Sequence, residues 1–376
     1  MKTRVVVVYG GESTEHEISC RSAAFVLGNI DREKYEVSAI AIDQQGRWLQ
    51  QNPERLLSEV STQSQKKLPI YPTAELPPQV VEENHLAMQS ITTTGQTSQA
   101  PTSKIVFFPV VHGTSGEDGA MQGFFDLSKV AYVGPPTLGA AMAMDKVIAK
   151  QRVEAAGVAV VPYKQIRYEA WLKNPRAFSE LCIKDLGEKV FIKPANLGSS
   201  VGVSPAFGAE ECHKACENAF TYDDKIIVET SVDAREIECA ALGGYEPEIS
   251  QPGEVVAHGG FYSYDAKYTD PNASTIKVPA ELSDEQADLV RRLAKQAFMA
   301  LELYGMARID FFLCKQTGKF YFNEANTIPG FTEISQYPQL WKHSGLDEKS
   351  LISRLIELAE ERQRDKLRLQ RVRGGS

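Results

Sequence analysis

A short segment near the C-terminal end, residues 306–326, constrains the fold most, because it has the pattern of a β-hairpin. Residues 307–313 alternate between apolar and polar side chains, as a strand with one buried face does. Residues 315–318 supply turn chemistry, and a second strand follows them. The segment therefore predicts two antiparallel strands with several polar side chains on one face.

Folding this hairpin places two carboxylates side by side. Asp310 on the first strand lies opposite Glu324 on the second, and Arg308 points to the same side as Asp310. Like charges in directly opposed positions destabilise a sheet, so the pair indicates a counter-ion. With the amide of Asn326 two residues further on, the pattern favours a hard divalent metal shared with substrate phosphates. A solvated acidic face on a surface hairpin is the alternative.

The length and charge of the chain limit the classes of protein to consider. A chain of 376 residues exceeds one ordinary core, so two or three domains are expected. The formal net charge of −8 argues against nucleic acid and anionic membrane surfaces as partners. The apolar stretches have the length of strands, and none reaches the roughly 18 residues of a spanning helix. The six cysteines lack framework spacing and the N-terminus has no signal-peptide pattern, which favours free thiols and a cytoplasmic location.

The first third of the chain has the pattern of a parallel α/β unit. A β-branched run is followed by Gly10-Gly11 and by a helix that Thr14 and Glu17 would open as a capping box. Residues 50–104 are rich in Gln, Ser, Thr and Pro and are interpreted as a loop-rich insertion. The expected strands cover residues 4–9, 36–42, 105–111 and 131–134.

The remaining two thirds alternate between strands and helices. The expected helices cover residues 137–157 and 208–220, a stretch from Ser283 as N-cap towards Gly305, and a stretch from about residue 348 onwards. The expected strands before the hairpin cover residues 158–163, 190–193, 201–204, 226–229 and 235–242. Cys212 and Cys216 are interpreted as two thiols on an amphipathic helix rather than as zinc ligands.

Three lysines stand in segments suited to phosphate. Lys193 closes a strand before a loop with Ser199 and Ser200, whose backbone N–H groups can form an anion nest; a flexible glycine turn is the alternative. Lys146 follows Met-Asp at the start of a helix, where an ordinary exposed lysine is the alternative. Lys267 lies among aromatic residues, and its loop is interpreted either as a lid over a site or as a surface loop packed by its own rings.

Two turns in the first unit also carry polar residues. The turn after Gly10-Gly11 holds Glu15 and two further carboxylates, which would repel phosphate, so the turn is no nucleotide fingerprint. Glu15 can meet a substrate cation such as an ammonium, although carboxylates at this position also simply oppose the helix dipole. The second turn begins with His112-Gly113 at the same sheet edge, where α/β proteins bind ligands.

Taken together, these segments resemble the D-alanine–D-alanine ligases of the ATP-grasp superfamily. The similarity extends from residue 5 to about residue 360 in the order of that family. The matching segments are residues 10–19, 112–119, 144–146, 191–204, 235–238, 264–268, 307–310 and 323–332. One such motif is weak evidence, whereas this set in one order is specific.

The resemblance implies an α/β fold, α+β in its ATP-binding part, with a three-domain ATP-grasp architecture. The implied units are an N-terminal parallel α/β domain (1–136), a central domain (137–230), a C-terminal domain with the metal site and the lid (231–365), and a tail (366–376). The implied reaction condenses two D-alanines through an acylphosphate, releases ADP and phosphate, and serves peptidoglycan precursor synthesis. The resemblance also implies ATP as substrate, two Mg²⁺ ions for which Mn²⁺ can substitute, and a homodimer. A monovalent-cation requirement and D-serine as a weaker second substrate stay open.

By the same resemblance, each candidate residue receives a role. The ATP-binding residues are Lys146, Lys193, Ser200, Glu229, Glu236 and Lys267, with Glu229 and Glu236 on the adenine and ribose. The metal ligands are Asp310, Glu324 and Asn326. The catalytic residues are Glu15, Ser199, Tyr268 and Arg308, of which Glu15 orients the first ammonium. The substrate-binding residues are His112, Gly330 and Ser335, the last two on the second carboxylate. Arg308 is expected to stabilise the negative oxygens of the intermediates rather than to pair with the neighbouring acids.

The sequence departs from the family at Leu197, where a polar residue is common, at Thr230, where a lysine is common, and before Met144, where a serine is frequent. None of these changes removes a group that the chemistry requires. Tyr268 disfavours D-lactate as second substrate, because ligases that make D-alanyl-D-lactate lack it. Two alternatives remain: an ATP-grasp ligase for another acid and amine, and an ATP-binding regulatory protein without turnover.

Overall fold

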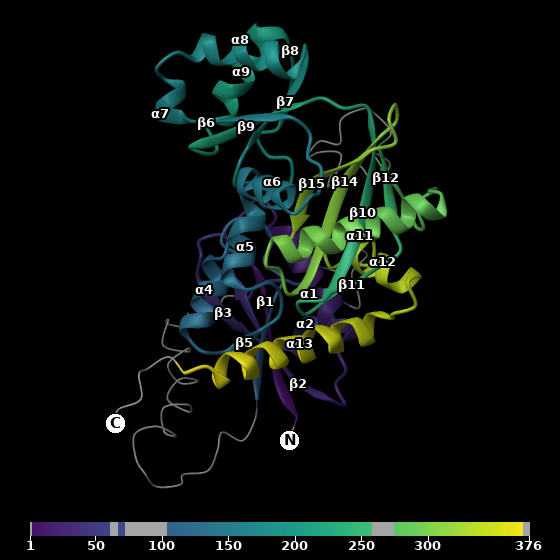
Figure 1. The fold of residues 1–376 in the computed structure, drawn as a ribbon. Helices are drawn as coiled ribbons and strands as arrows, with labels where there is room; N and C mark the ends of the chain where they lie inside the picture. The colour runs from purple at the N-terminus through teal and green to yellow at the C-terminus, as the bar shows by residue number, and fades with distance from the viewer. Residues whose placement is uncertain (1, 61–66, 72–103, 258–273, 371–376) are drawn as a thin grey trace, which may run out of the picture.

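The computed structural model describes residues 2–60, 67–71, 104–257 and 274–370. In this part of the chain the strands form three sheets of five, four and six strands. Figure 1 shows the four-stranded sheet at one end of the molecule, the six-stranded sheet in the middle and the five-stranded sheet at the other end. The expected mixed α/β class is confirmed, with one largely parallel sheet and two antiparallel ones.

The five-stranded sheet has the order β3-β2-β1-β4-β5 and is parallel except at its β3 edge. Its strands are β1 (Thr3–Gly10), β2 (Tyr35–Ile42), β3 (Trp48–Gln51), β4 (Ile105–Pro109) and β5 (Ala131–Tyr132). The central strand β1 is buried over its last six residues, as a strand covered on both faces must be. The helices of this region are α1 (His16–Asn29), α2 (Pro53–Val60) and α4 (Ala120–Leu127).

The expected capping box of α1 is wrong, because the helix begins at His16 and its N-cap is Glu15, which makes no side-chain capping bond. The expected insertion over residues 50–104 contains α2 in its described part, and residues 72–103 lie outside the described residues.

Asp145 divides the helix expected over residues 137–157 into α5 (Thr137–Met144) and α6 (Lys146–Ala155). Its side chain accepts hydrogen bonds from the backbone N–H groups of Val147 and Ile148, so it caps the second helix. The break places Lys146 at the first position of α6, as the sequence predicts.

The four-stranded antiparallel sheet has the order β6-β9-β7-β8. Its strands are β6 (Tyr163–Arg167), β7 (Lys189–Pro194), β8 (Ser204–Phe207) and β9 (Lys225–Thr230), and its helices are α7 (Tyr168–Trp171), α8 (Pro175–Leu186) and α9 (Gly208–Ala219). Helix α9 carries the buried thiols of Cys212 and Cys216, as expected. The strand expected over residues 158–163 is wrong in its bounds, because β6 begins only at Tyr163 and the residues before it make only a bridge between Val160 and Phe322. The strand expected over residues 201–204 is also wrong, because β8 begins only at Ser204.

The six-stranded antiparallel sheet has the order β13-β12-β10-β14-β15, with β11 beside β10. Its strands are β10 (Ala234–Gly243), β11 (Glu248–Ile249), β12 (Gly253–Ala257), β13 (Ser274–Lys277), β14 (Gly305–Cys314) and β15 (Phe320–Asn326). Helices α11 (Asp284–Ala300), α12 (Gln336–His343) and α13 (Glu348–Arg368) complete the fold. The predicted N-cap Ser283 is confirmed and forms a capping box with Gln286. Gly305 does not end α11 but begins β14.

The predicted hairpin is β14 and β15, and its predicted register is confirmed. Asp310 faces Glu324, and Leu313 faces Phe320 near the turn. The register shifts between these pairs, because Phe311 faces Phe322 and leaves Asn323 as an extra residue on β15. This β-bulge is what brings Glu324 opposite Asp310.

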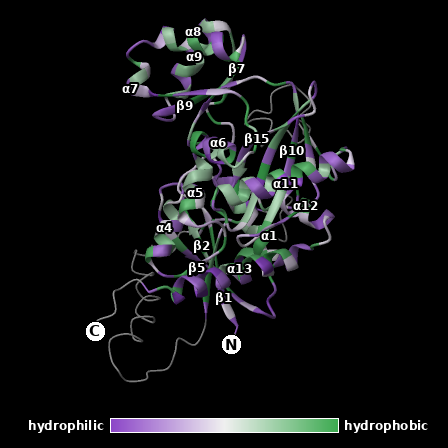
Figure 2. Cartoon of the chain, viewed as in Figure 1, coloured by the Kyte–Doolittle hydropathy of each residue, from purple (hydrophilic) through white to green (hydrophobic). Residues whose placement is uncertain are grey.

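Helix α13 returns from the six-stranded sheet to the first one, where it packs on β4, β5 and α1. Its inner face buries Leu351, Leu355 and Leu358 among others. Figure 2 shows hydrophilic and hydrophobic residues interleaved along α11 and α13, as expected for helices with one face on a core. Among the described residues, no helix is long and apolar enough to cross a membrane.

Candidate active site

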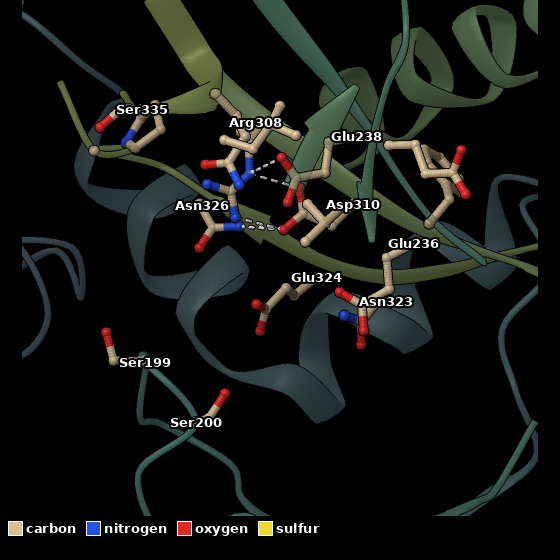
Figure 3. Close-up of a pocket in the computed structure, with 18 of the residues that line it drawn as sticks. Ser199, Ser200, Glu236, Glu238, Arg308, Asp310, Asn323, Glu324, Asn326 and Ser335 are labelled. Carbon is tan, nitrogen blue, oxygen red and sulfur yellow. Dashed lines mark hydrogen bonds and ion pairs between the residues drawn. The ribbon is translucent and has the colours of Figure 1, made fainter. Parts of the chain in front are cut away.

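A cavity of about 2030 Å³ is lined by residues from the two antiparallel sheets, from α1 and α2, and from the loops that follow β4, β7 and β15. Every predicted site residue that the structure describes lines this cavity. Lys267 and Tyr268 belong to residues 258–273, which lie outside the described part of the chain. Figure 3 shows the hairpin side chains on one side of the cavity and Ser199 and Ser200 on the other.

The hairpin presents a dense set of charged groups to the cavity. Arg308 makes a bidentate pair with Asp310, with Nε–Oδ1 and Nη2–Oδ2 distances of 2.8 and 2.7 Å. Arg308 also lies 3.2 Å from a carboxylate oxygen of Glu238 on β10, and the amide of Asn326 donates to Asp310 at 2.8 Å. Burial would lower the pKa of Arg308, but Asp310 and then Glu238 hold it well above its usual value. The expectation that Arg308 would not pair with the neighbouring acids is therefore wrong, and its expected role on the oxygens of the intermediates stays a prediction.

The oxygen atoms near the hairpin suit a hard divalent cation. Asp310 and Glu324 contribute carboxylates from opposed positions, and Asn326 contributes an amide oxygen. Within the described ranges, no group of three or more His, Cys, Asp or Glu side chains is arranged to hold a metal. A site of two carboxylates and an amide needs further oxygens from a substrate, which is how Mg²⁺ is commonly held beside phosphates.

Two lysines reach the cavity from neighbouring elements. Lys146, at the start of α6, donates to the carbonyl of Leu197 in the loop after β7, and its Nζ lies 3.7 Å from Glu324. Lys193, at the end of β7, lies 2.7 Å from Glu229 and donates to the Asn323 side chain at 3.3 Å. Both lysines are largely buried, which strengthens their interaction with an anion.

Glu229 lies between two lysines rather than open towards a nucleotide base. Its two carboxylate oxygens are 2.9 Å from Lys150 and 2.7 Å from Lys193, and the residue is 2% exposed. The two ammonium groups outweigh the effect of burial and lower the pKa of Glu229 to about 2. Glu236 lies near the start of β10 and lines the cavity.

The loop after β7 brings its backbone close to the first sheet. Ser199 and Ser200 both have left-handed backbones, with φ angles of 53° and 59°. A Cβ atom added at Gly198 would lie 3.5 Å from a carboxylate oxygen of Glu15. The predicted phosphate loop and the predicted ammonium-binding residue are therefore neighbours.

Glu15 is buried at the N-cap of α1, and a second carboxylate, Glu117, lies near it. Glu117 accepts backbone N–H bonds from Gly113 at 2.8 Å and from Ile328 at 2.9 Å. Burial raises the pKa of Glu117 to about 8, and the negative charge of Glu15 adds to this effect. Glu117 thus connects the turn after β4 to the segment after β15.

His112 makes a second connection to that segment. Its Nδ1 atom lies 2.8 Å from the carbonyl of Ile328, so Nδ1 carries the proton and donates. Burial lowers the pKa of His112, which leaves Nε2 as an acceptor for the hydroxyl of Ser22 at 2.8 Å. Ser22 in turn accepts from the backbone N–H of Phe331 at 3.1 Å. His112 therefore holds the backbone that flanks Gly330.

The segment after β15 carries the two predicted contacts for a second carboxylate. The hydroxyl of Ser335 accepts from the backbone N–H of Thr332 at 3.0 Å and lies 2.8 Å from its hydroxyl. A Cβ atom at Gly330 would lie 2.9 Å from this hydroxyl, so only glycine lets the two residues approach this closely.

Sequence reasoning missed several residues of the site. They are Glu117, Lys150, Glu238 and Asn323. The signal for Lys150 was its spacing of four from Lys146 on one helix, which places both on one face. Nothing in local spacing reveals Glu238, because it meets Arg308 across neighbouring strands.

Comparison with known proteins agrees with this geometry. Residues 4–135 match the family described as D-ala D-ala ligase N-terminus, and residues 153–357 match D-ala D-ala ligase C-terminus. D-alanine–D-alanine ligase A of Bradyrhizobium diazoefficiens is 42% identical over 372 residues, 98% of each chain. D-alanine–D-alanine ligase of Proteus mirabilis is 41% identical over 364 residues, 96% of each chain.

Two solved structures share the fold. The D-alanine-D-alanine ligase from Coxiella burnetii superposes with a TM-score of 0.76 at 32% identity and covers 97% of both chains. The VanG D-Ala:D-Ser ligase from Enterococcus faecalis superposes with a TM-score of 0.77 at 32% identity, over 96% of this chain and 100% of the other. With two matching family models and full-length relatives, the chain belongs to the D-alanine–D-alanine ligase family of ATP-grasp fold.

Proposed function

We propose that this chain joins two D-alanine molecules into D-alanyl-D-alanine, cleaving ATP to ADP and phosphate, for peptidoglycan precursor synthesis. The observation that carries the proposal is one cavity that joins two kinds of chemistry. Lys146, Lys193 and the hairpin acids suit a triphosphate, and Glu15 suits an ammonium. Two relatives described as D-alanine–D-alanine ligases, 42% and 41% identical over nearly their whole length, support the proposal.

The first step activates a carboxylate, which is a poor electrophile at neutral pH. In the proposed mechanism, Glu15 holds the ammonium of the first D-alanine so that its carboxylate faces the γ-phosphate. A carboxylate oxygen attacks the γ-phosphorus, the bond to the β-phosphate oxygen breaks, and ADP leaves. Lys146 and Lys193 neutralise phosphate oxygens, and the backbone of the loop with Ser199 and Ser200 covers them.

Asp310, Glu324 and Asn326 would hold the Mg²⁺ ions. When bound, such ions neutralise phosphate oxygens and help to orient the transferred group. The Asp310 carboxylate then serves both the ions and Arg308, since it already accepts two hydrogen bonds from the guanidinium.

The second step forms the peptide bond. Gly330 through its N–H and Ser335 through its hydroxyl hold the carboxylate of the second D-alanine. Its ammonium first gives up a proton to solvent water; the amine then attacks the acyl carbon of the acylphosphate, and phosphate leaves with the bonding electrons of the C–O bond. The planar guanidinium of Arg308 stabilises the negative oxygens that develop there.

The remaining assignments belong to the same proposal. Glu236 contacts the ribose. The adenine is contacted by the backbone of β9 around Glu229, because the carboxylate of Glu229 is paired with two lysines. Lys267 approaches the γ-phosphate, and Tyr268 links the lid to Glu15 through Ser199. We also propose three domains with boundaries near residues 136 and 230, in keeping with the three sheets, and a cytoplasmic homodimer.

Phosphate release in the presence of ATP and Mg²⁺, with amino acids offered singly and in pairs, tests the proposal. We expect release that depends on D-alanine and not on L-alanine, together with a D-alanyl-D-alanine product detected by mass spectrometry. Equal release with an unrelated acid and amine, or no release at all, would refute it.

D-Serine as second substrate forms the sharpest comparison, because the VanG relative is a D-Ala:D-Ser ligase. With equal concentrations of D-alanine and D-serine, we expect D-alanyl-D-alanine as the main product. A dominant mixed dipeptide would reassign the second substrate and leave the acid-activating step unchanged.

A further inference from the structure

Lys150 is a fully buried lysine that the mechanism above does not use. It lies on α6 one turn after Lys146, and its side chain is 0% exposed. Its Nζ atom lies 2.9 Å from Oε1 of Glu229 and donates to the carbonyl of Phe322 at 3.3 Å. Burial lowers the pKa of Lys150, and the charge of Glu229 opposes this effect. Because moving an ammonium out of water is costly, a lysine in this position requires a compensating role.

Glu229 is shared between Lys150 and Lys193. Its Oε2 atom lies 2.7 Å from Nζ of Lys193, so each carboxylate oxygen faces one ammonium. Lys193 lines the cavity, whereas Lys150 lies behind Glu229, away from the cavity wall. Two ammonium groups and one carboxylate give this cluster a net charge of +1, and Lys193 is the ammonium that lines the cavity.

Charge balance shows what Lys150 adds. With Lys193 alone, the carboxylate of Glu229 would cancel the one positive charge, and a phosphate would meet a neutral pair. With Lys150 on the other oxygen, the carboxylate is neutralised from behind. Lys193 has three donors, of which Glu229 and Asn323 take two, so one remains for a phosphate oxygen.

We propose that Lys150 is a positioning residue that, by sharing Glu229, keeps the charge and one donor of Lys193 available to the phosphates of ATP. The inference rests on the proposed function, in which Lys193 binds ATP. It assigns Glu229 a role as a bridge between two lysines, beside any contact that its backbone segment makes with adenine.

Equilibrium binding of ATP and of adenosine to the full chain, measured by calorimetry with Mg²⁺, tests this role. The dissociation constant for adenosine divided by that for ATP isolates the phosphate contribution from changes at the base, and this ratio falls when phosphate contacts are lost. Lys150→Met keeps the length and apolar stem of the side chain and removes its charge. We expect this variant to lower the ratio about tenfold, as the loss of a charge-assisted hydrogen bond would, with adenosine binding unchanged.

Removing the carboxylate as well supplies the decisive comparison. In Lys150→Met/Glu229→Gln the cluster again has a net charge of +1, carried by Lys193. We therefore expect the double variant to recover the ratio to within about threefold of the wild type, although it has lost two interactions. If Lys150 only stabilised the fold, the effects of the two substitutions on the ratio would add, and the double variant would show a lower ratio than Lys150→Met alone.

Lys225→Met is the matched control. Lys225 is also buried and also paired with one carboxylate, that of Asp145, which caps the same helix α6. Its ion pair is with Asp145 and not with Glu229, so its loss is expected to lower the melting temperature without changing the ratio. Adding Glu229→Gln to Lys225→Met should bring no recovery of any property.

An unchanged ratio in Lys150→Met, or no recovery in the double variant, would overturn the inference. If Lys150→Met does not fold, Glu229→Gln alone decides, because a freed Lys193 must bind phosphates at least as tightly as in the wild type, and a fall in the ratio would contradict the inference. A wild-type chain that does not bind ATP would refute the proposed function itself.

Discussion

Ser22 provides a test of how the second half of the site is held. Its hydroxyl accepts from the backbone N–H of Phe331 and donates to Nε2 of His112, at 3.1 and 2.8 Å, and the residue is 0% exposed. Ser22→Ala leaves both of these buried groups without a partner. Each such group costs about 1–3 kcal/mol, so the substitution should destabilise the folded chain by about 2–6 kcal/mol. The segment that it releases carries Gly330.

Ser19→Ala is a closely matched control on the same helix. Ser19 is equally buried, accepts from the N–H of Gly10 at 2.7 Å and donates to the carbonyl of Val110 at 2.6 Å. Its loss should cost a similar amount, about 2–6 kcal/mol, but its partners lie on β1 and directly after β4, not beside Gly330.

Urea unfolding midpoints and steady-state kinetics distinguish the two variants. Both should shift the midpoint downwards by similar amounts. Only Ser22→Ala should raise the KM for the second D-alanine, by at least about fivefold, which corresponds to about 1 kcal/mol of binding. Equal KM values in the two variants would show that the His112–Ser22 chain stabilises the fold without positioning the second substrate.

Three further predictions concern the charged groups of the site. Asp310→Asn and Glu324→Gln should each raise the Mg²⁺ concentration needed for half-maximal rate and lower turnover about 10²-fold or more; Mg²⁺ titrations with unchanged midpoints would refute the metal assignment. Arg308→Lys should lower kcat with little change in the Kd for ATP, because lysine cannot reproduce the planar fork; equal losses in both would contradict its role in the second step. Because the lysines lower the pKa of Glu229 from 4.5 to about 2, its ionised form stabilises the folded state by about 3 kcal/mol above pH 5, and this stabilisation is lost as the pH falls towards 2. The difference in unfolding midpoint between the wild type and Glu229→Gln should shrink over that pH range, and a difference that is constant with pH would refute the linkage.

The elements that sequence reasoning predicted correctly are those whose cause is local. The hairpin has turn residues and alternation, and β1 has an unbroken β-branched run. The stretch 158–163 is also rich in valine, but before Tyr163, where β6 begins, it makes only the bridge from Val160, because strand formation depends on a partner strand. The break at Asp145 was missed because an aspartate inside a helix-forming stretch reads as one unfavourable residue, whereas its side chain here starts a new helix.

The site shows the same division. Asp310 and Glu324 meet through a local register that the sequence encodes. Glu117 and Ile328 are 211 positions apart and meet only in the folded chain. The pairing of Arg308 with Asp310 was missed for another reason. Asp310 was assigned to a metal and Arg308 to the reaction intermediates, although the two side chains are neighbours on one face of β14 and bind each other.

The extra residue at Asn323 determines which changes in chain length the hairpin can accept. In a regular strand, adjacent side chains point to opposite faces, yet Asn323 and Glu324 both line the cavity, one beside Lys193 and the other opposite Asp310. Deleting one residue between Phe322 and Glu324 would restore a regular ladder and remove this doubled presentation. At the other end of the hairpin, Gly318 has open space around it, so insertions there would leave the frame of the acids unchanged. Natural length variation in such a hairpin should therefore accumulate at the turn and avoid the bulge.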